Sequence, residues 1–155
     1  TGGTFTITNG GVFGSMLSVA CLICNVAKPH CEVPCGIYGD QQRFEAMLED
    51  TKTIAKACAQ IIELSEKEDA LSHNQLARWV ATKELHATKI QTTISQYFMT
   101  QRIKPDAADY AKKLTSAHAV MIAAMKSKQG VDAELGEKLK ASIMTFYKAY
   151  EGKEK

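Results

Sequence analysis

The chain has 155 residues, of which 45% are hydrophobic and 23% are charged, which is typical of one soluble globular domain. Its formal net charge is only +2, and no run of lysine and arginine occurs. These features argue against a nucleic-acid partner. Most of the glycines lie before residue 40 and only three prolines occur, so the rest of the chain favours long helices.

Residues 1–29 differ in composition from the rest of the chain. They contain no acidic residue and one basic residue, Lys28. The apolar run over 16–26 is too short to span a bilayer; it resembles the apolar part of an export signal, although a basic stretch before it is missing. We interpret 1–29 as a removable leader or pro-segment. An ordinary buried N-terminal strand or helix is the alternative.

The five cysteines are unevenly distributed. Cys21, Cys24, Cys31 and Cys35 fall within fifteen residues, whereas Cys58 stands apart in an amphipathic pattern. An odd, clustered set is a poor disulfide framework and favours metal or redox chemistry. Cys58 is expected to be a small buried apolar residue.

The segment 30–38 reads HCEVPCGIY and contains one imidazole and two thiols within six residues. Thiolates are soft ligands, and imidazole suits nickel, copper, zinc and iron. The Cys-x3-Cys spacing lets one loop bring both sulfurs to the same ion. His30, Cys31 and Cys35 are therefore the candidate metal ligands.

Spacing alone leaves two other interpretations open. Cys21 and Cys24 could join Cys31 and Cys35 in a structural zinc site, although zinc sites usually place longer spacers between their cysteine pairs. A disulfide between Cys31 and Cys35 would suit an exported protein but leaves His30 unexplained.

From residue 40 onward, apolar residues recur at three- and four-residue steps, as in amphipathic helices. The pattern predicts helices over about 40–64, from about 72 through 98, over about 107–125, and from about 132 to 150. A charged loop over 65–70, Pro105 and Gly130 separate them. Four such helices with short loops predict an all-α four-helix bundle.

Several residues have the side chains expected at helix ends. Ser72 and Gln75 fit a capping box, Asp106 and Asp132 can cap the third and fourth helices, and Gly130 suits a C-terminal cap. The apolar stripes also place three further residues in the core: Val80, Ile122 and Met125.

The segment HCEVPCGIY closely resembles the nickel-binding hook of nickel superoxide dismutases, whose common form is His-Cys-Asp-x-Pro-Cys-Gly-x-Tyr. Glu32 replaces the usual Asp, and Val33 and Ile37 occupy variable positions. The resemblance covers about 30–155, strongly at the hook and more loosely in the helices. We therefore divide the chain into a leader (1–29), a hook (30–38) and a four-helix bundle (39–155).

The resemblance implies a specific metal site. A processing protease would cut between Pro29 and His30, and the uncut chain would be inactive because it lacks the terminal amine. A nickel ion would be bound by the His30 amine, the Cys31 amide nitrogen and the sulfurs of Cys31 and Cys35, with the His30 imidazole as axial ligand. Tyr38 would guard the substrate position. The reaction is the disproportionation of superoxide to dioxygen and hydrogen peroxide, with cycling between Ni(II) and Ni(III).

The resemblance also implies residues that support the metal site. Glu45 follows the hook closely and could orient the axial imidazole, or it could be a solvated residue in the first helical turn. Lys83 and His86 lie on the apolar stripe of the second helix, which is unusual for such residues, and His86 stands where the resemblance would place an arginine. The alternatives are a snorkelling lysine and a hydrogen-bonded core histidine.

At the level of the whole protein, the resemblance implies a homohexamer with no membrane association in its mature form. Localisation is expected to be cytoplasmic, or exported or organellar if the leader is a targeting signal. The main functional alternative is a non-catalytic nickel- or zinc-binding helical protein, which redox turnover after processing would exclude. A non-catalytic helical interaction protein is a second alternative, which nickel retention would argue against.

Overall fold

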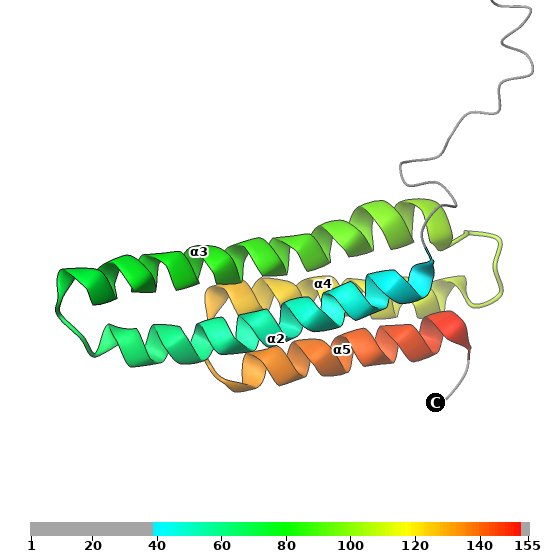
Figure 1. The fold of residues 1–155 in the computed structure, drawn as a ribbon. Helices are drawn as coiled ribbons and strands as arrows, with labels where there is room; N and C mark the ends of the chain where they lie inside the picture. Colours follow the sequence, from blue (N-terminus) through cyan, green and yellow to red (C-terminus); the bar gives the residue numbers. More distant parts are fainter. Residues whose placement is uncertain (1–38, 153–155) are drawn as a thin grey trace, which may run out of the picture. The chain divides into compact units, whose positions relative to one another are not determined.

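The computed structural model describes residues 39–152 (Figure 1). The predicted leader and hook lie outside the described residues. The described part contains four α-helices and a π-helical segment: α2 (Asp40–Ser65), α3 (Ala70–Thr92), η2 (Thr93–Arg102), α4 (Tyr110–Gln129) and α5 (Glu134–Glu151). The predicted all-α four-helix bundle is confirmed.

The helices run up and down, so each end of the bundle collects particular residues (Figure 1). The start of α2, the end of η2 and the end of α5 meet at what we call the near end. The turn between α2 and α3 forms the far end, and in Figure 1 it extends beyond the turn between α4 and α5. With 26 residues, α2 is eight residues longer than α5, which has 18. The outermost turns of α2 and α3 therefore form a two-helix hairpin.

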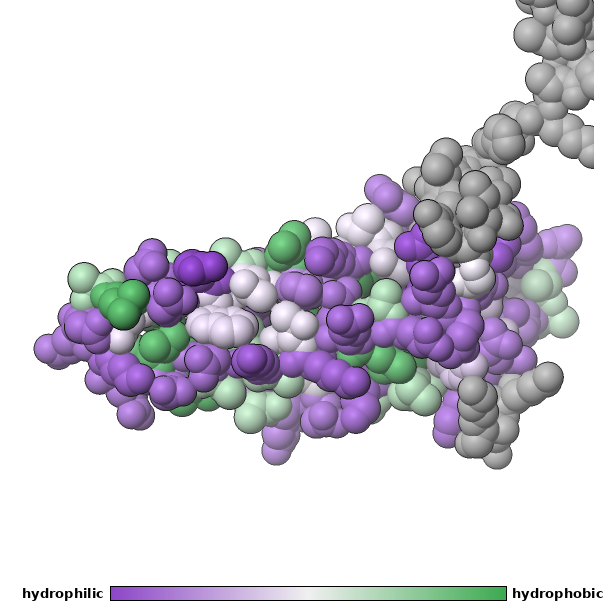
Figure 2. Space-filling view, in the orientation of Figure 1, coloured by the Kyte–Doolittle hydropathy of each residue, from purple (hydrophilic) through white to green (hydrophobic). Residues whose placement is uncertain are grey.

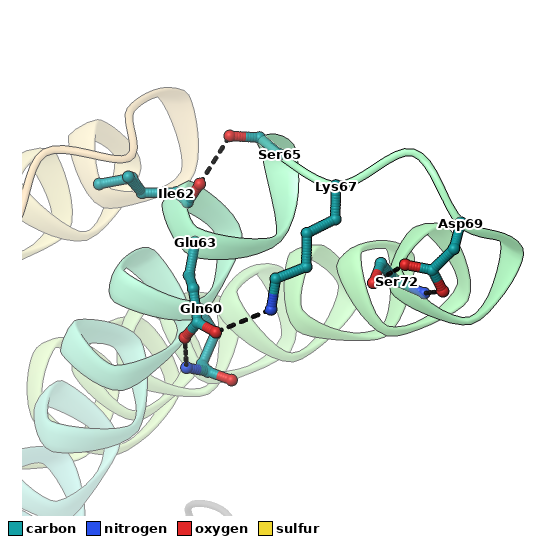
Figure 3. A network of polar contacts seen from close by, with 7 residues as sticks. All are labelled: Gln60, Ile62, Glu63, Ser65, Lys67, Asp69 and Ser72. Carbon is teal, nitrogen blue, oxygen red and sulfur yellow. Dashed lines mark hydrogen bonds and ion pairs between the residues drawn. The ribbon is translucent and has the colours of Figure 1, made fainter.

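The far-end turn is stabilised by side chains that are close in sequence (Figure 3). Lys67 Nζ lies 3.0 Å from Glu63 Oε1, and Gln60 donates to the other oxygen of Glu63. Asp69 is the N-cap of α3: its carboxylate accepts from the Ser72 amide at 3.0 Å and from the Ser72 hydroxyl at 2.5 Å. The predicted capping box starting at Ser72 is therefore wrong, because Ser72 lies inside the first turn and donates to the true cap.

The other predicted helix ends had mixed outcomes. Asp132 Oδ1 accepts a hydrogen bond from the amide of Glu134, the first residue of α5, but the N-cap position is Ala133. Gly130 follows α4 as predicted, with an extended backbone. The prediction for Asp106 is wrong, because turns continue past it and α4 begins only at Tyr110.

Aromatic side chains fill the near-end part of the core. The ring of Phe44 lies 4.8 Å from that of Phe98 and 5.3 Å from that of Phe146, measured between centroids. Phe98 also packs edge-on against Tyr150, at 5.2 Å. Such tilted and edge-on pairs are the favoured aromatic geometries. The near ends of α2, η2 and α5 are thus joined by one aromatic cluster.

Further from the near end, the core is built from aliphatic and small residues, including the buried Cys58 that the pattern predicted. On α4 the fully buried positions are Ala117, Val120, Ala124 and Ser127. The predicted burial of Val80, Ile122 and Met125 is wrong, because they are 40%, 37% and 41% exposed. The small residues beside Ile122 and Met125 face the core and permit close packing, which leaves the larger side chains on the flank of the helix.

The face of the bundle seen in Figure 2 is mostly polar, with separate apolar patches between the charged side chains. Within residues 39–152, no helix combines the length and the apolar character that a bilayer crossing requires.

Candidate functional site

The segment η2 continues α3 toward the near end with a wider turn. The amide of Ile103 donates to the carbonyl of Phe98, five residues earlier, at 2.8 Å, and the Thr100 hydroxyl reaches the Ser95 carbonyl across the same interval. The sequence pattern predicted a continuous α-helix through residue 98. Changing the hydrogen-bond interval changes which side chains face the bundle, and π-helical turns occur frequently at functional sites.

Four side chains from three elements converge at the near end, and we call them the Asp40 cluster: Asp40, Tyr97, Arg102 and Tyr150. Asp40 Oδ1 accepts from the Tyr97 hydroxyl at 2.6 Å and from Arg102 Nε at 2.8 Å, and Arg102 Nη2 lies 2.7 Å away. Asp40 Oδ2 accepts from the Tyr150 hydroxyl at 2.6 Å. Asp40 of α2 therefore accepts hydrogen bonds from η2 on one carboxylate oxygen and from α5 on the other.

The cluster has defined protonation states. Burial raises the pKa of Asp40, but the hydrogen bonds from the two phenols and the guanidinium outweigh it, so the pKa lies below the usual 3.8. Burial, followed by the hydrogen bond to the carboxylate, raises the pKa of Tyr150 and of Tyr97 above the usual 10.0. Near neutral pH, Asp40 is thus an anion that accepts from two protonated phenols.

Cationic side chains also lie near the two aromatic rings of the cluster. The guanidinium carbons of Arg43 and Arg102 lie 5.1 and 5.4 Å from the ring centroid of Tyr97. Lys113 Nζ lies 5.0 Å from the ring centroid of Tyr150. These are cation–π distances, so the near end combines one partly buried carboxylate with several positive groups.

Asp40 lies close in the sequence to the predicted metal-binding hook. Asp40 is the first residue of α2 and lies two residues after Tyr38, the last residue of the predicted hook. Sequence reasoning missed the whole cluster. It treated the tyrosines as core residues, and helical periodicity carries no information on which distant residues meet Asp40.

The three residues predicted to support the metal do not come together in the described structure. Glu45 is exposed and accepts from Gln41 Nε2 at 2.9 Å, one turn earlier on α2. His86 Nδ1 lies 2.5 Å from Asp50 Oδ1, a contact between α3 and α2 that the sequence did not indicate. The roles suggested for these residues stay predictions.

Lys83 is engaged away from the near end. It is only 3% exposed, and its Nζ donates to the carbonyls of Lys128 and Gly130, both at 2.6 Å. A cation at the carbonyl end of a helix is favourable because it balances the helix dipole. Lys83 thus joins α3 to the end of α4.

The predicted ligands His30, Cys31 and Cys35, together with Tyr38, lie outside the described residues. Residues 39–152 contain no group of three or more His, Cys, Asp or Glu side chains placed to hold a metal ion. The chemistry of the predicted donors does fit nickel: thiolates with nitrogen donors suit the tetragonal geometry that Ni(II) prefers. The assignment of His30, Cys31 and Cys35 as metal ligands therefore stays a prediction.

Comparison with protein families gives one match. The family model described as "Nickel-containing superoxide dismutase" matches residues 25–154. The match includes the whole of 30–38 as well as all four helices of the bundle. The comparison with curated proteins gave no match, and neither did the comparison with solved structures.

Proposed function

Because the chain belongs to the nickel-containing superoxide dismutase family, it is an oxidoreductase with a nickel cofactor, and we propose that it acts on superoxide through residues 30–38 after cleavage before His30. The observation that carries the proposal is the family match, which includes a segment with two thiols and an imidazole within six residues. The reaction consumes two superoxide anions and two protons and yields one dioxygen and one hydrogen peroxide.

The proposed ligands are the His30 amine and imidazole, the Cys31 amide nitrogen, and the sulfurs of Cys31 and Cys35. Bound nickel supplies the one-electron redox step in both directions, and anionic sulfur and nitrogen donors favour its oxidised state. Tyr38 is proposed to control access of the substrate. Thiols must lose their protons to bind a metal, so nickel affinity should fall in acid.

Cleavage before His30 is part of the proposal because of covalent chemistry. While Pro29 is attached, His30 has an amide nitrogen and no free amine. An amide is a weaker donor unless it is deprotonated, and a proline-linked His30 cannot supply a terminal amine. The leader would therefore withhold one ligand until a processing protease removes it.

The test compares two forms of the same protein. The full chain is produced with a protease site before His30, loaded with nickel, and assayed for superoxide decay before and after cleavage. High activity only after cleavage is expected. Equal activity in both forms would contradict the role of the terminal amine, and nickel binding without activity in either form would favour the non-catalytic binding protein.

Two cysteine variants provide a matched comparison in the cleaved chain. Cys31→Ser removes a proposed ligand and should abolish both activity and tight nickel binding. Cys58→Ala changes a fully buried cysteine of the core and should keep both, with some loss of stability. Full activity in Cys31→Ser would refute the proposed ligand set.

A homohexamer is a further part of the proposal. Exposed apolar side chains support association, among them Ile122 and Met125 on α4 and Met144 on α5. Analytical ultracentrifugation of the cleaved, nickel-loaded protein would test it, and a monomer at micromolar concentration would contradict it.

A further inference from the structure

We propose that Asp40 is a positioning residue for the metal site: its hydrogen bonds to Tyr97, Arg102 and Tyr150 hold the point of the bundle from which the hook extends. This inference rests on the proposed function of residues 30–38. It assigns to the Asp40 cluster a role in the reaction, although none of its members is proposed to bind nickel.

The first argument is that Asp40 joins three parts of the bundle at one carboxylate. Its partners are 57, 62 and 110 positions away in the chain, on η2 and α5. Hydrogen bonds to an ionised group are shorter and stronger than neutral ones. The start of α2 is thereby tied to both neighbouring elements.

The second argument is that no local cap fixes the start of α2. The N-cap residue is Gly39, whose lack of a side chain leaves the cap without a side-chain hydrogen bond. At the start of α3, by contrast, Asp69 caps the helix with its own carboxylate. The first turn of α2 is therefore positioned by long-range contacts: the bonds of Asp40, the hydrogen bond that the Tyr147 hydroxyl donates to Gln41 Oε1, and the packing of Phe44.

The third argument is covalent reach. Tyr38 and Cys35 precede Asp40 by only two and five residues in the chain, and each residue adds at most about 3.6 Å of reach. Loosening Asp40 therefore loosens the attachment point of a segment whose ligands need accurate placement. The geometry around a metal is commonly tuned by groups that do not bind it directly.

The fourth argument concerns the chemistry that the position requires. A carboxylate accepts on both oxygens, and at Asp40 both face donors. The amide of asparagine has only one acceptor oxygen, and its NH2 group would face a hydroxyl or the guanidinium. Asp40→Asn therefore removes the charge and one of the two acceptor oxygens, which weakens the cluster while preserving the size of the side chain.

The experiment uses the chain cleaved before His30 in three forms: the unsubstituted protein, Asp40→Asn, and Asp69→Asn as the matched control at the far end. Nickel affinity is measured by competition with a chelator, and the oxidised metal is examined by electron paramagnetic resonance. We expect Asp40→Asn to weaken nickel binding roughly 10- to 100-fold and to broaden the resonance signal. Asp69→Asn should leave both unchanged.

A second readout reports on the cluster itself. Ultraviolet titration of tyrosine follows the phenols of Tyr97 and Tyr150, whose pKa values the Asp40 carboxylate raises. In Asp40→Asn their ionisation should shift to lower pH. If this shift appears while nickel affinity and the resonance signal match those of the unsubstituted protein, the cluster is purely structural and the proposal is overturned.

Two further outcomes separate this proposal from the one on which it rests. Failure of the unsubstituted cleaved protein to bind nickel would refute the proposed function itself. If Asp40→Asn does not fold, Tyr150→Phe replaces it, because this change removes the bond to Oδ2 and keeps the pair with Arg102. A smaller loss of nickel affinity is then expected, and no loss would overturn the positioning role.

Discussion

At the near end of the bundle, hydrogen bonds connect Asp40 with residues 57 to 110 positions away. At the far end, the side-chain bonds drawn in Figure 3 join residues three or four positions apart. The near end also contains the aromatic cluster around Phe44 and Phe98, whereas Leu71 at the far end is 68% exposed.

The difference shows that the helices are fixed relative to one another more firmly at the near end than at the far end. A local bond stabilises one turn, whereas a bond between distant residues fixes helices relative to one another. The more tightly cross-connected end is the one that follows the hook in the chain. The far end can therefore vary without disturbing the proposed metal site, and the four predictions below test this contrast and the packing between the two ends.

The largest loss of stability is expected when an aromatic ring is removed at the near end. Phe98 is fully buried between Phe44, Phe146 and Tyr150. Phe98→Ala should lower the free energy of unfolding by about 3–5 kcal/mol, because it removes apolar contact and leaves a cavity. Urea denaturation measures the change. The far-end control Leu71→Ala should stay within about 0.5 kcal/mol, and equal losses would contradict the contrast.

The next effect tests the close approach of α5 to α2. A Cβ at Gly136 would lie 2.8 Å from the Cβ of Ala55. Gly136→Ala should therefore destabilise the protein by about 1–3 kcal/mol through overpacking, despite the better helix propensity of alanine. In a thermal-denaturation double-mutant cycle, Ala55→Gly should offset part of this cost. Strict additivity would show that the two positions do not touch.

The third effect is the pH dependence of the Asp40 cluster. The folded-state pKa of Asp40 is lowered from 3.8, so its contribution to stability is present above that value and is lost as pH falls through the lowered pKa. Near neutral pH, Asp40→Asn should reduce the free energy of unfolding by roughly 1–3 kcal/mol. The difference in free energy of unfolding between the unsubstituted protein and Asp40→Asn should disappear in acid. If this difference were independent of pH, the charge of Asp40 would make no contribution to stability.

The smallest effect belongs to the far-end ion pair. Hydrogen bonding to Lys67, the charge of Lys67 and a bond from Gln60 lower the pKa of Glu63. Lys67→Gln should move the Glu63 pKa back toward 4.5 in a nuclear magnetic resonance titration, with no resolvable change in the unfolding midpoint, because both side chains of the pair are exposed. A clear loss of stability would show that the far end is more tightly held than its contacts indicate.

The sequence by itself determined the features that depend on neighbouring residues. Apolar periodicity identified the four helices, and the first predicted end, residue 64, differs by one residue from the observed Ser65. Asp132 was recognised as a residue at the start of the fourth helix because its hydrogen bond to the Glu134 amide is local, although the N-cap position is Ala133. The hook was predicted from its resemblance to a family motif, and a motif of nine consecutive residues needs no tertiary information.

Only the tertiary structure decided which distant residues meet. Lys83 stood out because it is a charged residue on an apolar stripe, but its partners, the carbonyls of Lys128 and Gly130, lie more than forty positions away. The π-helical turn of η2 and the exposure of Ile122 likewise depend on how neighbouring helices pack. The Asp40 cluster could not be read from the sequence, because there its residues are ordinary members of helices. They form a site only because the bundle brings the ends of α2, η2 and α5 together.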